Sequence, residues 1–191
     1  YQATEITTKC GAPSWEGQSD EYCVVMPAAD RSLQEAIHAE NIAGNKFNVV
    51  QQIVRDVATG LQELHTLGIM HADIKPRNVV RTGSDWKLID LDAARTLGEL
   101  LDASSKSSSG YVPPEMAFIL FSGEEETKEE TNDETSGKPT KAHPTFDIWS
   151  LGVLLYQLCT EQSLFTVNVN SDNLLSDADK NRLVAWDQPS E

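Results

Sequence analysis

Four polar residues near the middle of the 191-residue chain have the types and spacing that phosphoryl transfer requires. Asp73, Lys75 and Asn78 lie within one short segment, and Asp90 follows 17 residues after Asp73. Such a transfer needs a carboxylate near the attacking hydroxyl, a cation beside the transferred phosphoryl group and oxygen ligands for magnesium. These four side chains offer a group for each of those tasks.

Each of these residues, taken alone, has a simpler explanation. A single Asp or Asn in a loop is usually a solvated turn residue, and a single Lys is usually a surface cation. His71, at the start of the same segment, is expected to be a core histidine bonded to backbone. The combination is more specific, because four chosen residue types at fixed offsets between a long helix and a strand pair seldom arise by chance.

The hydrophobic pattern shows which elements must position these side chains. Apolar residues recur at steps of three and four and predict a helix from about residue 47 to 67. The residues of this face are Phe47, Val50, Val54, Val57, Leu61 and Leu64. Gly68 is expected to end the helix. Short apolar runs at 69–70, 79–80 and 86–89 predict brief strands around the polar segment.

Further elements are expected on both sides of this central region. Asp30 or Ser32 is expected to cap a short helix that runs toward Ala39. The segment 146–159 is apolar almost all round, which predicts a buried helix. A strand is expected at 4–10, a buried strand at 21–26 and a last, weaker helix within 173–186.

The chain is strongly acidic, with 15 basic and 30 acidic side chains and a formal net charge of −15. Such a surface repels phosphate backbones and anionic lipid, so nucleic acids and membrane surfaces are poor partner candidates. No apolar run is long enough to predict a membrane-spanning helix. Residues 1–11 lack the features of a signal peptide, and Cys10, Cys23 and Cys159 have no metal-site spacing. We therefore expect a cytoplasmic location.

Residues 123–142 form a low-complexity stretch that contains no large apolar residue. It carries seven acidic and three basic side chains. This composition cannot bury enough apolar surface to order itself, so we expect a disordered acidic insertion. Two interpretations of its role remain open: it attracts basic substrates or partners, or it is a solvated loop without a task.

The polar segment belongs to a larger set of motifs. His71–Asn78 reads HADIKPRN and resembles the HRDLKPEN catalytic loop of eukaryotic protein kinases, and Ile89–Asp92 resembles their magnesium-binding DFG segment. Three further matches occur in the same order as in that family: YCVVMPA resembles the hinge strand, GYVPPE the APE segment, and FDIWSLGV the start of the large central helix. The resemblance covers roughly residues 20–185. It implies an α+β, protein kinase-like fold with a mainly α-helical C-lobe and a few short β-strands.

The resemblance implies a role for each of the four central residues. Asp73 would be the catalytic base, and Lys75 would steady the phosphate that is transferred from ATP. Asn78 and Asp90 would hold Mg²⁺. A lysine two residues after Asp73 resembles the serine/threonine class rather than the tyrosine class. The implied function is therefore ATP-dependent phosphorylation of serine or threonine in protein substrates.

Nucleotide binding is implied for residues at the hinge and beyond the catalytic loop. Met26 and Ala28 would offer backbone groups to adenine, with Val25 as the gatekeeper. Val80 would form the floor of the nucleotide pocket.

Structural or regulatory roles are implied for His71, Ser108, Glu115 and Asp147. Ser108 would contact Lys75, and Asp147 would bond the backbone of the catalytic loop. Glu115 usually pairs with an arginine much further along such chains. Arg182 is too near in sequence, so we expect this partner to be missing.

Among the departures from the family pattern, those at Ala72 and Asp92 bear on function. Ala72 replaces the arginine that commonly reads an activation-loop phosphate, so we expect no switching through that contact. Asp92 replaces the glycine of the DFG segment and loses its backbone freedom. The Asp92 carboxylate either lies near the metal site or points to solvent.

The expected domain organisation follows from a further departure. The chain contains no Gly-rich phosphate loop, and only 21 residues precede Tyr22. We therefore expect residues 1–31 to be a remnant of the N-lobe with the hinge, and residues 32–191 to be a kinase C-lobe. Such a chain is expected to have little kinase activity by itself.

Two other functions remain open on the sequence alone. Small-molecule phosphotransferases of the aminoglycoside or choline kinase type share an HxDxxxxN loop and a metal segment like Ile89–Asp92. Lys75, the PPE segment and DIWSLG favour the protein kinase. A non-catalytic, pseudokinase-like scaffold is the third interpretation, although an intact set of polar residues argues against it.

Overall fold

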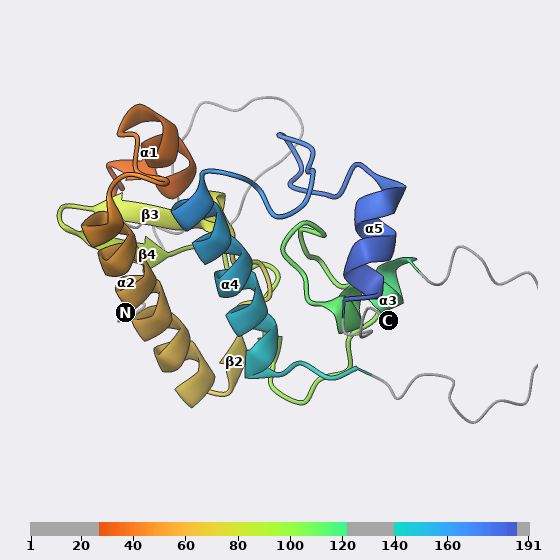
Figure 1. Cartoon of the computed structure of the whole chain (residues 1–191). Helices are drawn as coiled ribbons and strands as arrows, with labels where there is room; N and C mark the ends of the chain where they lie inside the picture. Colours follow the sequence, from red (N-terminus) through yellow and green to blue (C-terminus); the bar gives the residue numbers. More distant parts are fainter. Residues whose placement is uncertain (1–26, 122–139, 187–191) are drawn as a thin grey trace, which may run out of the picture.

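A computed structural model of the chain describes residues 27–121 and 140–186 (Figure 1). The predicted strands at 4–10 and 21–26 lie outside the described residues, as do Val25 and Met26. Of the predicted insertion at 123–142, only the last three residues are described. There, Leu101 N–H donates to the Thr140 carbonyl at 2.9 Å.

The first described helix begins where the sequence predicts. β1 (Arg31–Ser32) leads directly into α1 (Leu33–Ala39). The Ser32 hydroxyl accepts a hydrogen bond from Glu35 N–H, and the Glu35 carboxylate accepts one from Ser32 N–H at 2.8 Å. This reciprocal capping box satisfies two backbone donors that a helix start leaves open. Ser32 is therefore the cap.

The long helix α2 (Phe47–Thr66) confirms the periodicity prediction. Gly68 follows it with φ of +76°, a conformation that suits glycine at a helix end. The buried residues of α2 are Val50, Ile53, Val57 and Leu61. Phe47 was expected on this face but is 59% exposed, because the first residue of the helix lies beyond the core that the later turns cover.

In the described residues, five short strands form two antiparallel sheets. β3 (Val79–Thr82) pairs with β1 and with β4 (Asp85–Leu88), which gives the order β1-β3-β4. β2 (Ile69–Met70) pairs with β5 (Arg95–Thr96). The predicted strands at 69–70, 79–80 and 86–89 are confirmed within one or two residues, whereas β5 was not predicted. The short helix η1 (Pro76–Asn78) connects the polar turn to β3.

Helix α4 (Pro144–Thr160) lies between two groups of elements (Figure 1). One side faces α2, while α3 (Pro114–Phe121) and α5 (Asp177–Val184) pack together on the other. The sequence predicted α4 and α5 but not α3. The expected buried helix α4 is only partly buried, because Ile148, Leu155 and Tyr156 are exposed.

Within ranges 27–121 and 140–186, the buried apolar side chains form two clusters that share α4. The first joins α1, α2 and β4 to Leu154 and Leu158 of α4. The second joins α3, α5 and their flanking loops to Phe146 at the start of α4. Together these elements confirm the expected α+β class. No helix in the described ranges 27–121 and 140–186 is long and apolar enough to cross a membrane.

The polar segment after α2 crosses the boundary between the two clusters. Ala72 belongs to the second cluster and Ile74 belongs to the first. Asp73 lies between them and is itself buried. Its backbone is therefore held by apolar packing on both sides, which limits the movement of the carboxylate.

Candidate active site

A buried carboxylate fixes the backbone ahead of Asp73. Asp147 in α4 is fully buried and accepts hydrogen bonds from the backbone N–H groups of His71 and Ala72, each at 2.9 Å. Ala72 has φ of +67°, which is uncommon for a residue other than glycine. The two hydrogen bonds hold this turn, and the turn directs the next residue, Asp73, into the site.

His65 also contacts Asp147, and the sequence reasoning did not single it out. Its Nε2 atom lies 2.7 Å from Asp147 Oδ2, although the two residues are 82 positions apart. His65 belongs to the last turn of α2, so Asp147 joins α2, the polar loop at 71–78 and α4. A histidine at the end of a helix is common, and nothing in its local sequence identifies a partner so far away.

His71 is fully buried and joins the polar loop at 71–78 to the residue that follows β4. Its Nε2 atom lies 3.1 Å from the Ile89 carbonyl oxygen, which can only accept a hydrogen bond, so we assign the ring hydrogen to Nε2. Its Nδ1 atom is then free to accept a hydrogen bond from Asp73 N–H at 3.4 Å. This imidazole thus connects the backbones on both sides of the site.

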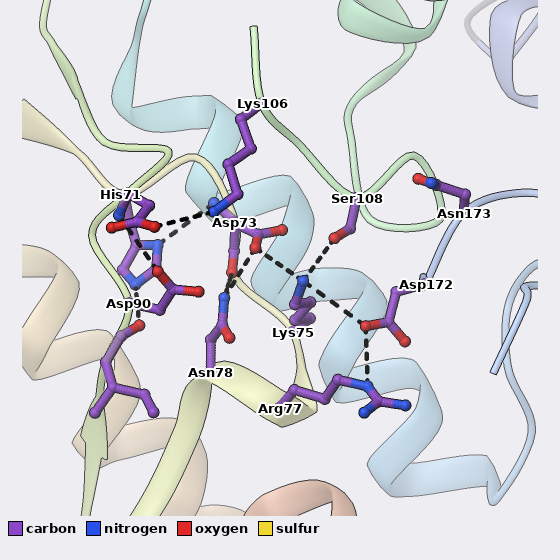
Figure 2. A network of polar contacts seen from close by, with 12 residues as sticks. His71, Asp73, Lys75, Arg77, Asn78, Asp90, Lys106, Ser108, Asp172 and Asn173 are labelled. Carbon is purple, nitrogen blue, oxygen red and sulfur yellow. Dashed lines mark hydrogen bonds and ion pairs between the residues drawn. The ribbon is translucent and has the colours of Figure 1, made fainter. Parts of the chain in front are cut away.

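Asp73, Lys75 and Asn78 lie in direct contact (Figure 2). Lys75 Nζ is 2.9 Å from Asp73 Oδ2, and Asn78 Nδ2 donates to that same oxygen, also at 2.9 Å. Asn78 Nδ2 also donates to the Asp73 carbonyl at 2.8 Å. The Lys75 and Asn78 side chains therefore both constrain the same oxygen of the Asp73 carboxylate.

The second oxygen of this carboxylate is different. Asp73 Oδ1 is buried and accepts no hydrogen bond from any residue in the described part of the chain. A buried carboxylate oxygen without a donor is unfavourable, and such atoms are rare outside functional sites. Asp73 Oδ1 therefore offers a place for the hydroxyl of a bound molecule.

Asp73 is also held in its charged form. Burial acts to raise the pKa of this carboxyl, but the Lys75 ammonium and the Ser108 and Asn78 side chains outweigh burial, so the pKa lies below its usual value. Asp73 is thus an anion at neutral pH, able to accept a hydrogen bond from a hydroxyl.

The lowered pKa gives a testable prediction. An aspartate in an unfolded chain titrates near pH 3.9, whereas Asp73 titrates lower in the folded protein. Its charge therefore stabilises the fold above the unfolded value, and that stabilisation is lost as the pH falls through the lowered folded value. We expect the carboxyl carbon NMR signal of Asp73 to have its titration midpoint below about pH 3.9. A midpoint above that value would contradict the assignment.

Asn78 and Asp90 lie at the same end of the β3–β4 hairpin. Val79 pairs with Leu88, and Ile89 N–H donates to the Asn78 carbonyl at 3.0 Å. Because Asn78 Nδ2 donates to Asp73, the amide oxygen of Asn78 is left for another ligand. Asp90 is exposed, and its backbone has φ of +65°.

Asn78 and Asp90 supply two oxygen donors. Such a pair suits Mg²⁺ that is also bound by water and phosphate, rather than a metal ion held by protein side chains alone. Mg²⁺ prefers oxygen, keeps several waters and usually takes only one or two protein side chains together with substrate phosphates. The described residues contain no group of three or more His, Cys, Asp or Glu that could hold a metal ion by themselves. The donor set at Asn78 and Asp90 is therefore compatible with Mg²⁺ held jointly with a phosphate.

Lys75 has a second set of contacts. Its Nζ atom donates to the Ser108 hydroxyl at 2.8 Å and lies 3.7 Å from Asp172 Oδ2. The Ser108 contact is the one that the sequence resemblance implied. The contact with Asp172, and a further ion pair between Asp172 and Arg77 at 3.2 Å, were not foreseen.

The remaining candidate residues are placed as follows. Val80 is buried in β3, and Ala28 is exposed, while Met26 is outside the described residues. Glu115 is exposed, and no ion pair joins it to Arg182 within the described residues. Asp92 is exposed and forms an ion pair with Lys106 at 3.3 Å.

Comparisons with known proteins agree with this geometry. Residues 12–190 match the model of the protein kinase domain. The chain is 31% identical over 137 residues to the calcium/calmodulin-dependent protein kinase kinase cmkC of Emericella nidulans, covering 70% of the chain and 23% of that protein. It is 31% identical over 151 residues to the serine/threonine-protein kinase TIO of Arabidopsis thaliana, covering 78% of the chain and 10% of that protein.

A third relative is the serine/threonine-protein kinase KSP1 of Saccharomyces cerevisiae. It is 27% identical over 155 residues, which cover 80% of the chain and 14% of that protein. The chain thus spans less than a quarter of the length of each of these three relatives. The match to the domain model nevertheless extends over nearly the whole sequence. The chain belongs to the protein kinase domain family.

Proposed function

We propose that the protein carrying this chain transfers the γ-phosphoryl group of ATP to serine or threonine hydroxyls of protein substrates. The observation that carries the proposal is Asp73 Oδ1, a buried and charged carboxylate oxygen without a donor in the described residues. It lies on the same carboxylate that Lys75 and Asn78 hold. The serine/threonine kinases among the relatives support the choice of acceptor.

In the proposed reaction, Asp73 Oδ1 accepts the hydrogen of the substrate hydroxyl and orients its oxygen for attack. The new bond joins the substrate hydroxyl oxygen to the γ-phosphorus, while the bond from phosphorus to the bridging oxygen of ADP breaks. Lys75 lies beside Asp73 and offsets negative charge on the group in transfer. The hydroxyl proton leaves with the Asp73 carboxyl or with the product phosphate.

Asn78 and Asp90 are the residues that would hold Mg²⁺ in this site. When bound, the ion supplies positive charge that stabilises the phosphates of ATP. Asp90 is joined to the rest of the site through Ile89, whose carbonyl oxygen is bonded to His71. The contact between His71 and Ile89 therefore links the backbone beside Asp90 to the loop that carries Asp73.

Replacement of Asp90 tests the metal-binding part of this proposal. In the longest native protein that contains the chain, Asp90→Asn should weaken ATP binding in the presence of Mg²⁺ by roughly ten- to a hundredfold, the effect of one lost charged contact. ATP binding with EDTA in place of Mg²⁺ should change little. Isothermal titration calorimetry measures both affinities.

Asp85→Asn is the matched control, because Asp85 is exposed at the start of β4, at the end of the hairpin that lies away from the site. It should leave both affinities unchanged. Equal loss of affinity with and without Mg²⁺ in Asp90→Asn would contradict a metal-binding role.

A substrate panel with basic proteins, aminoglycosides and choline would separate a protein kinase from a small-molecule phosphotransferase.

A further inference from the structure

The loop between α4 and α5 is closed on itself by several hydrogen bonds. Val167 and Leu174 form an antiparallel bridge, and Asn168 N–H donates to the Asn173 carbonyl at 2.8 Å. Asp172 N–H donates back to the Asn168 carbonyl at 2.9 Å. Asp172 has φ of +58° and is only 7% exposed, although it is charged. The loop therefore places an acidic side chain inside the protein.

The buried carboxylate of Asp172 lies between the two cations of the catalytic loop (Figure 2). Its Oδ2 atom is 3.2 Å from Arg77 Nε and 3.7 Å from Lys75 Nζ. Arg77 also donates to the carbonyl of Val169 in the same loop. Asp73 and Asp172 thus balance the charges of Lys75 and Arg77. This balance depends on the α4–α5 loop, which lies about 95 residues later in the chain.

The same loop contacts the segment that carries Ser108. Gly110 N–H donates to the Asp172 carbonyl at 3.1 Å, and Leu174 N–H donates to the Ser109 hydroxyl at 2.9 Å. A Cβ atom on Gly110 would lie 2.8 Å from the Asp172 carbonyl oxygen and would clash with Val167. Gly110 therefore permits an approach that any other residue would prevent.

We propose that Asp172 is a positioning residue for Lys75, acting from the α4–α5 loop on the reaction proposed above. Lys75 Nζ lies among three oxygens, those of Asp73, Ser108 and Asp172. Asp172 holds the position of this ammonium group through its charge and the position of Ser108 through the backbone of Gly110. Correct placement of the cation depends on this loop, although Asp172 touches neither Asn78 nor Asp90 within the described contacts.

Asp172→Asn isolates the charge from the shape of the loop. Asparagine has nearly the same size and tolerates the left-handed backbone conformation of Asp172, so the turn is expected to persist. In the longest native protein that contains the chain, we expect kcat for phosphate transfer to fall about ten- to a hundredfold, as for other small misplacements of a catalytic group. KM for ATP should remain within about twofold, because the metal-binding residues keep their contacts.

Two further variants complete the kinetic experiment. Asp85→Asn makes the same chemical change at an exposed position and should leave kcat unchanged. Arg77→Gln breaks the other half of the ion pair, so a double variant with Asp172→Asn should lose less activity than the product of the two single losses. Unchanged kcat in Asp172→Asn, or a KM increase equal to the loss of kcat, would overturn the positioning role.

Amide hydrogen exchange separates this inference from the proposed function. Asp172→Asn should speed exchange in the segment 104–111 relative to Asp85→Asn, because Lys75 loses the charge of Asp172 and then holds the Ser108 hydroxyl less firmly. If wild type transfers phosphate and Asp172→Asn is fully active, the function stands and the inference fails. If wild type transfers no phosphate, the proposed function fails and hydrogen exchange alone tests the inference. An unchanged exchange rate in 104–111 would then reject the link from Asp172 to Ser108.

Discussion

An Asp73→Asn variant of the longest native protein that contains this chain is expected to transfer phosphate roughly 10²- to 10⁴-fold more slowly than wild type. The change removes the negative charge and the free carboxylate oxygen that would orient the attacking hydroxyl. Affinity for ATP with Mg²⁺ should be nearly unchanged, because Asn78 and Asp90 retain their oxygen atoms. Phosphate incorporation into a basic protein measures the rate, and calorimetry measures the affinity.

The control for this variant must change one aspartate without touching the site. Asp85→Asn does so on the exposed hairpin turn and should transfer phosphate at the wild-type rate. Equal rates for wild type and Asp73→Asn would reject the role of Asp73 as base. A parallel loss of rate and ATP affinity would instead indicate that Asp73 binds the nucleotide.

Asp147→Ala is expected to cause the largest loss of stability. Its carboxylate is fully buried and accepts hydrogen bonds from His71 N–H and Ala72 N–H. Without it, two buried backbone donors lose their acceptor at about 1–3 kcal/mol each, so the free energy of unfolding should fall by about 2–6 kcal/mol. Urea unfolding followed by circular dichroism measures this change.

The expected loss at Asp147 depends on its buried contacts and not on the loss of any acidic side chain. Asp85→Ala removes an exposed carboxylate that is bonded to the Ser84 hydroxyl, and it should shift the unfolding midpoint only slightly. Asp147→Asn should be milder than Asp147→Ala, because an amide oxygen can still accept one of the two hydrogen bonds. A midpoint for Asp147→Ala equal to that of Asp85→Ala would show that the polar loop at 71–78 does not need this anchor.

Local patterns predicted most of the elements that the structure describes. The apolar period of α2, the cap at Ser32 and the glycine at 68 are properties of neighbouring residues, and the structure confirms all three. Helix α3 was missed because its eight residues are almost all apolar and have no clear period. Strand β5 was missed because its two residues are extended only through pairing with β2.

The candidate site was predictable only where its residues are close in sequence. Asp73, Lys75 and Asn78 form one motif, and the structure brings them into contact. His65 and Asp172 have no such local pattern, because each gains its partner through folding. Asp172 is 95 positions from Arg77, and its buried position follows from the shape of the α4–α5 loop.

The contacts of Asp147 have a consequence for attempts to reduce the site to a peptide. A fragment of residues 65–92 would contain His65, every proposed reactive side chain and the β3–β4 hairpin. It would lack the acceptor for His71 N–H and Ala72 N–H, which lies 76 and 75 positions away. The left-handed turn at Ala72 is disfavoured by about 1–2 kcal/mol in an L-residue. Such a peptide should therefore leave this turn largely unformed, since the shape of the loop is imposed by α4 and is not encoded in the loop itself.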